Sequence, residues 1–110
     1  MKNTILIDPI NETLTEVKVD TLEDIYSMLD VELIQVGHYL PNGDVIYVDE
    51  EALLKSTPIN KAFFYGESRT PLLGKGLIIG TGKDGDSVSC LTTMDEAEQQ
   101  VRIVSVAFKN

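Results

Sequence analysis

Residues 40–48, LPNGDVIYV, decide the fold, because they join a strong turn to a strand. Asn42 and Gly43 tolerate the positive φ angles that tight hairpin turns require. The run 45–48 is rich in β-branched residues and predicts a strand, and the apolar residues within 32–40 predict the strand that pairs with it. The stretch therefore predicts an antiparallel hairpin in the middle of the chain.

The residues before this hairpin predict a second hairpin and a helix. Segments 4–7 and 14–19 have the apolar content and alternation of paired strands. Thr21 and Asp24 stand in capping-box positions ahead of apolar residues spaced as on one helical face, which predicts a helix over 22–29. A short helix is expected after Asp49, through residue 54.

The residues after the central hairpin predict further strands. We expect a looser stretch over 59–71, a buried strand interrupted by glycines over 72–80, a turn at 83–86 and a return at 87–91. A short helix near 94–98 and a terminal strand over 101–108 complete the pattern.

These elements predict an α+β fold, a small and mainly antiparallel sheet with two or three short helices on one face. The length of 110 residues predicts a single domain over residues 1–110. Periodicity also predicts the core. Its members are Leu22, Ile25, Leu29, Val36, Ile46, Val48, Leu53, Leu77, Ile79, Val104 and Val106.

Composition favours a globular protein of the cytoplasm. Hydrophobic residues make up 43% and charged residues 25%, as in ordinary globular chains. No apolar run approaches the roughly 18–20 residues that span a bilayer, and we see no signal peptide. The single Cys90 cannot form an intrachain disulfide, which fits a reducing compartment.

The charge is distributed unevenly along the chain. Residues 1–51 hold twelve of the 18 acidic residues but only two of the nine basic ones, and the net charge is −9. Nucleic acids and anionic membranes should repel such a protein, so we expect neither as a direct partner. The acidic half is either a surface for a basic partner or only a well-solvated surface.

Two glycine-rich stretches fail as ligand motifs. Residues 66–76 depart from the phosphate-binding loop in the spacing of their glycines. Gly76 stands after Gly74-Lys75 where the motif has the Ser or Thr that binds Mg²⁺, and a strand is expected next in place of a helix. Residues 80–86 lack the oxygen donors of a calcium loop and are typical of a hairpin turn. With one His and one Cys, a zinc site is not expected, so we predict no metal and no cofactor.

His38 and Cys90 are the only pair that suggests nucleophilic catalysis. Sequence separation does not prevent them from meeting in space. Cys90 nevertheless stands in a strand-like context, where a free cysteine behaves as a small hydrophobe. We therefore predict no catalytic residues and a protein that is not an enzyme.

The segment 40–91 resembles a family of small phage- and mobile-element-borne proteins known only as a domain of unknown function. The similarity lies in 44–54, DVIYVDEEALL, in 58–62, PINKA, in 71–80, PLLGKGLIIG, and in 84–87, DGDS. Ala52 departs from the glycine expected there. The resemblance implies a phage-like origin and a fold, and no catalytic residues.

The leading hypothesis is a non-enzymatic acidic binding protein of phage type. It would antagonise a host nucleic-acid-processing or defence complex by presenting carboxylates to a basic protein surface, as DNA presents its phosphates. The candidate partner-binding residues are Asp20, Glu23, Asp24, Asp30, Glu32, Asp44, Asp49, Glu50 and Glu51.

The alternative is a small-molecule or nucleotide-binding module that sequesters its ligand. It rests on the aromatic and cationic groups that base and phosphate recognition prefer. The candidate residues are Phe63, Phe64, Tyr65, Arg69 and Lys75. The sequence leaves the oligomeric state open, a homo-oligomer included.

Overall fold

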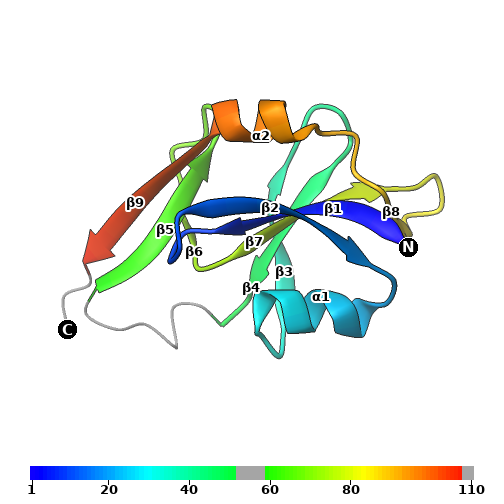
Figure 1. Ribbon diagram of the computed structural model, residues 1–110, viewed down its shortest axis with the longest axis horizontal. Coiled ribbons are helices and arrows are strands. Elements are labelled where there is room, and N and C mark those ends of the chain that lie inside the picture. The colour runs from blue at the N-terminus through cyan, green and yellow to red at the C-terminus, as the bar shows by residue number, and fades with distance from the viewer. Residues whose placement is uncertain (52–58, 108–110) are drawn as a thin grey trace.

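The computed structural model describes residues 1–51 and 59–107, which form two antiparallel sheets and two helices (Figure 1). The main sheet has the order β2-β1-β7-β4-β3, with β8 paired to β7. The second sheet has the order β6-β5-β9. The main-sheet strands are β1 (Lys2–Asp8), β2 (Thr13–Val19), β3 (Ile34–Tyr39), β4 (Val45–Asp49), β7 (Gly76–Thr81) and β8 (Ser87–Val88). The remaining elements are β5 (Ile59–Tyr65), β6 (Leu72–Leu73), β9 (Val101–Ala107), α1 (Leu22–Leu29) and α2 (Met94–Gln100).

The main sheet is buried on both faces, because its inner strands carry apolar residues at successive positions. On β7, Ile78 packs into one cluster with Phe63 and Ala97, which come from β5 and α2. Leu77 and Ile79 pack into a second cluster with α1. The two helices therefore lie on opposite sides of the main sheet (Figure 1), and the expectation that the helices share one face is wrong.

Local sequence signals fix α1 as expected. The Thr21 side chain accepts a hydrogen bond from the Asp24 N–H at 3.2 Å, and the Asp24 carboxylate accepts from the Thr21 N–H at 3.0 Å. Asp30 ends the helix at a φ of +56°. Ile25 and Leu29 are buried, but Leu22 is 55% exposed, so its assignment to the core is wrong. As the first residue of the helix, Leu22 lies at the edge of the buried face.

The central hairpin is confirmed. β3 pairs antiparallel with β4, with a register shift between Val36 and His38, and Gly43 adopts a φ of +97° in the turn. Among the predicted core, Ile46, Val48, Leu77 and Ile79 are buried as well, whereas Val36 and Val104 are only partly buried. Leu53, the side chain of Val106 and the predicted helix beyond residue 51 lie outside the described residues.

Two predictions for the second half are corrected. The stretch predicted as loose contains β5, the middle strand of the second sheet, and its partner β9 lies about forty residues further along the chain. The predicted strand 72–80 divides at Gly74, whose φ is +76°, into β6 of the second sheet and β7 of the main sheet. This single turn moves the chain from one sheet to the other.

Gly76 lets the two sheets approach closely. A Cβ atom at this position would lie 2.5 Å from Phe63 Cζ and 3.1 Å from Ile46 Cγ2, both in fully buried side chains.

We therefore expect Gly76→Ala to lower the free energy of unfolding by about 1–3 kcal/mol through overpacking. Urea denaturation followed by circular dichroism measures this loss. Phe63→Leu makes space for the added methyl group. The double variant Gly76→Ala, Phe63→Leu should therefore lose less unfolding free energy than the sum of the losses of the two single variants. Full additivity would contradict the predicted contact.

A buried carboxylate joins the central hairpin to the chain segment before α2. Asp44 is 1% exposed, and its oxygens accept hydrogen bonds from the Leu91 N–H at 3.0 and 3.1 Å. They also accept from the Thr92 N–H at 2.8 Å and the Thr92 hydroxyl at 2.6 Å. The prediction that Asp44 contacts a partner is therefore corrected, because its carboxylate is consumed inside the fold.

Replacing Asp44 tests this role. Asp44→Ala leaves two backbone N–H groups and a buried hydroxyl without an acceptor, so we expect a loss of about 2–5 kcal/mol in unfolding free energy. Glu50→Ala removes an exposed carboxylate and should change stability by less than about 0.5 kcal/mol. Equal effects of the two variants in urea denaturation would contradict the structural role of Asp44.

Candidate functional site

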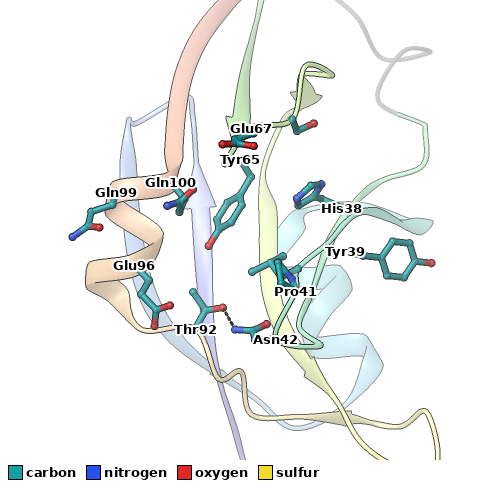
Figure 2. Close-up of a pocket in the computed structure, with 13 residues that line it drawn as sticks. His38, Tyr39, Pro41, Asn42, Tyr65, Glu67, Thr92, Glu96, Gln99 and Gln100 are labelled. Carbon is teal, nitrogen blue, oxygen red and sulfur yellow. Dashed lines mark hydrogen bonds between the residues drawn. The ribbon is translucent and has the colours of Figure 1, made fainter.

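A groove of about 720 Å³ lies between the end of β3, the end of β5 and α2 (Figure 2). Its lining comes from three segments that are distant in sequence, at 38–42, 65–68 and 92–100. The lining residues are His38, Tyr39, Leu40, Pro41, Asn42, Tyr65, Gly66, Glu67, Ser68, Thr92, Glu96, Gln99 and Gln100. The volume falls in the range of ordinary ligand pockets.

Hydrogen bonds hold these three segments together. The Asn42 side-chain amide donates to Thr92 Oγ1 at 3.0 Å, which ties the hairpin turn to the start of α2. The Gly66 N–H donates to the Gln100 carbonyl at 2.9 Å, which ties the end of β5 to the end of α2. These bonds hold the three segments that line the groove in fixed positions relative to one another.

Tyr65 forms the inner wall of the groove. Its side chain is only 6% exposed, and its ring centroid lies 5.8 Å from that of His38. In Figure 2 the ring extends between the α2 side, with Gln100 and Glu96, and the hairpin side, with His38 and Pro41. Burial is the main factor that raises the pKa of the Tyr65 hydroxyl, and the Glu96 and Asp44 carboxylates raise it further.

The α2 helix holds the acidic and amide groups of the opposite wall. Thr93 caps the helix, and the Glu96 carboxylate accepts from the Thr93 N–H at 3.2 Å and from its hydroxyl at 3.0 Å. Ala97 faces the core and is fully buried, which fixes the rotation of the helix. That rotation leaves Glu96, Gln99 and Gln100 along the groove.

The predicted acidic residues, Asp44 aside, lie at or near the surface. Asp20, Glu23, Asp30, Glu32 and Glu50 are exposed. Asp24, Asp49 and Glu51 are partly buried. Asp24 belongs to the α1 cap, and the Asp49 carboxylate accepts a hydrogen bond from the Glu51 N–H at 2.8 Å. These eight carboxylates are therefore exposed or partly exposed, and two of them, Asp24 and Asp49, also have local structural roles.

The residues predicted to bind a nucleotide do not form one site. Phe63 is fully buried in the core, so it cannot contact a ligand. Phe64 points the other way and stacks under the Arg102 guanidinium at 5.1 Å. Tyr65 alone lines the groove, whereas Arg69 is exposed and the charge of Lys75 acts on Asp8. The three adjacent aromatic residues therefore point to different faces of β5, as alternation along a strand requires.

The sequence-based reasoning missed most groove residues. Glu67, Glu96, Gln99 and Gln100 each look like ordinary solvent-facing residues of a turn or a short helix. For His38 the sequence suggests only a catalytic pairing with Cys90. The one available signal was Tyr65 itself, an aromatic residue in a strand next to a glycine and an acid.

The described residues show neither a metal centre nor a membrane span. Across 1–51 and 59–107, no group of three or more His, Cys, Asp or Glu side chains is arranged to hold a metal ion. Within the same ranges, no helix has the length and apolarity needed to cross a bilayer.

Comparison with known proteins places the chain in a family. A family model described as a domain of unknown function (DUF3846) matches residues 1–102. The chain belongs to this family. No curated protein and no solved structure gives a significant match. The suspected membership of an uncharacterised domain family is confirmed, and the DUF3846 match extends beyond residues 40–91 to include α1, the first hairpin and α2.

Cys90 is separate from the groove lining in this DUF3846 protein. Its thiol packs partly buried against the core and lies 3.5 Å from the Thr92 carbonyl, to which it donates. Burial, followed by the nearby Asp44 carboxylate, raises the pKa of this thiol to about 11. A thiol in this environment is a poor nucleophile near neutral pH.

We expect Cys90 to react with iodoacetamide at pH 8 about a hundredfold more slowly in the folded protein than in urea, because only the thiolate reacts. The folded-state rate should rise with pH until about 11. Mass spectrometry of timed samples measures both rates. Equal rates in the folded and unfolded chain would show that the thiol is not shielded.

Proposed function

We propose that this DUF3846 protein is a non-enzymatic binding protein that contacts a basic protein surface. The observation that carries the proposal is the acidic surface, defined as Asp20, Glu23, Asp24, Asp30, Glu32, Asp49, Glu50 and Glu51. The chain has no lysine or arginine between Lys18 and Lys55, so no basic residue from this long segment offsets these charges. The negative electrostatic field of these carboxylates would attract a basic partner and speed its association.

Two parts of the acidic surface meet at one end of the central hairpin. Ile34 pairs with Asp49, and the Glu50 N–H donates to the Leu33 carbonyl at 3.1 Å, so the segment leaving α1 runs beside the end of β4. Glu32 and Glu50 therefore lie on neighbouring strand ends. Leu33, whose carbonyl accepts the Glu50 N–H, is 47% exposed and offers an apolar contact beside these charges, as protein interfaces do.

The class of partner follows from the charge. Proteins that process nucleic acids carry basic surfaces for phosphate, and a dense row of carboxylates competes for such a surface. We propose a host nucleic-acid-processing or defence complex as the target, with the protein acting as its antagonist in a phage-like setting. Direct binding to nucleic acid is not part of this proposal, because like charges repel.

Affinity capture from a bacterial lysate tests the proposal. We expect recovery of a basic, nucleic-acid-binding protein at 50 mM salt and a loss of about tenfold or more at 500 mM salt, because salt screens exposed charges. The neutral triple variant Glu23→Gln, Asp30→Asn, Glu32→Gln should fail to retain the partner at low salt.

The matched control is Glu16→Gln, Asp84→Asn, Glu98→Gln, which removes three exposed charges outside the acidic surface. It should retain the partner. If both triple variants lose the partner equally, net charge and not this surface is responsible. If the capture resists high salt, the electrostatic proposal is overturned.

A second candidate function is a small-molecule or nucleotide-binding module. The groove favours it, since 720 Å³ of space with aromatic, amide and carboxylate groups is typical of ligand sites. Within this candidate, the groove lining replaces the predicted residue set apart from Tyr65. A small molecule released from the purified protein on denaturation, detected by mass spectrometry, would favour this candidate.

A further inference from the structure

The groove has a negative electrostatic character. Glu67 and Glu96 line it from two different segments, one after β5 and one on α2. Among the described residues, no lysine or arginine belongs to the lining, although the Arg102 guanidinium donates to the carbonyl of the lining residue Gly66 at 3.4 Å. Behind Thr92, the buried Asp44 carboxylate adds a third negative charge. Burial first, and then the Glu96 and Asp44 carboxylates, raise the pKa of the Tyr65 hydroxyl.

The groove also offers aromatic rings beside these charges. Tyr65 and His38 form a tilted pair in its wall, and Tyr39 at the rim is 73% exposed. The electron-rich face of a tyrosine ring attracts a cation, more strongly where water is partly excluded. Carboxylates and aromatic faces in one groove are the combination that recognises ammonium and guanidinium groups.

The polar lining is rich in hydrogen-bond acceptors. Besides the two carboxylates, the side-chain amides of Gln99 and Gln100 line the groove and add acceptor oxygens as well as N–H donors. Guanidinium and ammonium groups only donate hydrogen bonds, and they match such a lining. A phosphate or nucleotide would instead be repelled by the two carboxylates. Arg69 and Lys75, the candidate phosphate-binding residues of the sequence analysis, do not belong to the lining.

We propose that the groove binds a small organic cation, an aliphatic amine or guanidine. This inference rests on the second candidate function and names its ligand class. The aliphatic chain lies along the groove wall beside Tyr65, and the cationic group interacts with the Glu96 carboxylate, while Glu67 adds a negative charge at the other end of the groove (Figure 2). The acidic surface around α1 is a separate region and has no part in this binding.

The test compares two probes that share shape and differ in charge. Butylguanidinium is a cation, and butylurea is its neutral counterpart. We expect titration of the ¹⁵N-labelled protein with butylguanidinium to shift the amide signals of Gly66, Thr92, Gln99 and Gln100. Butylurea should bind at least about tenfold more weakly, because it lacks the charge-assisted hydrogen bonds.

Glutamine variants locate the effect. Glu96→Gln should weaken butylguanidinium binding about three- to fivefold, the size of a partly screened ion pair, and Glu67→Gln should weaken it less. Glutamine at position 96 keeps an acceptor for the Thr93 cap, so α2 should persist by circular dichroism. Glu98→Gln is the matched control, an exposed residue of the same helix outside the groove, and should leave the affinity unchanged.

Four outcomes would overturn the inference. Equal binding of butylurea would show that charge is not recognised, and equal weakening by Glu98→Gln would show that only net charge matters. Groove shifts caused by adenosine monophosphate but not by butylguanidinium would refute the cation while leaving a ligand-binding module in place. If no probe shifts the amide signals, the cation inference fails. The second candidate function, a ligand-binding module, fails as well only if the purified protein also releases no small molecule on denaturation.

Discussion

The architecture depends on the burial of one carboxylate. Asp44 sits at the start of β4, 1% exposed, and holds the backbone of residues 91 and 92 with its oxygens. A buried anion is tolerated only when donors surround it, and here two N–H groups and the Thr92 hydroxyl do so. This set of bonds fixes where α2 begins, and the position of α2 in turn sets one wall of the groove.

Sequence reasoning predicted the elements whose causes are local. The α1 cap needs only Thr21 and Asp24, three residues apart, and the central turn needs only Asn42 and Gly43. It failed where the cause is distant. β5 becomes a strand because it pairs with β9 far along the chain, and the apolar run 77–79 shows that both faces of β7 are covered but not which helix covers each face.

The same distinction explains the candidate site. Acidic residues concentrated in one half of a chain are visible in the sequence, and most of them do reach the surface. Asp44 could not be separated from them, because its burial follows from a contact with a segment almost fifty residues away. The groove could not be predicted for the same reason, since Tyr65, Glu67 and Glu96 come to line one groove only when the second sheet and α2 pack on the main sheet.

The two-faced burial of the main sheet also separates the two proposed binding regions. α1 covers one face and carries much of the acidic surface around it, whereas α2 lies on the other side and lines the groove (Figure 1). The central hairpin spans both regions, with its turn beside α2 and its strand ends beside the exit of α1. A ligand in the groove therefore leaves the acidic surface accessible, so each region can be altered and tested without removing the other.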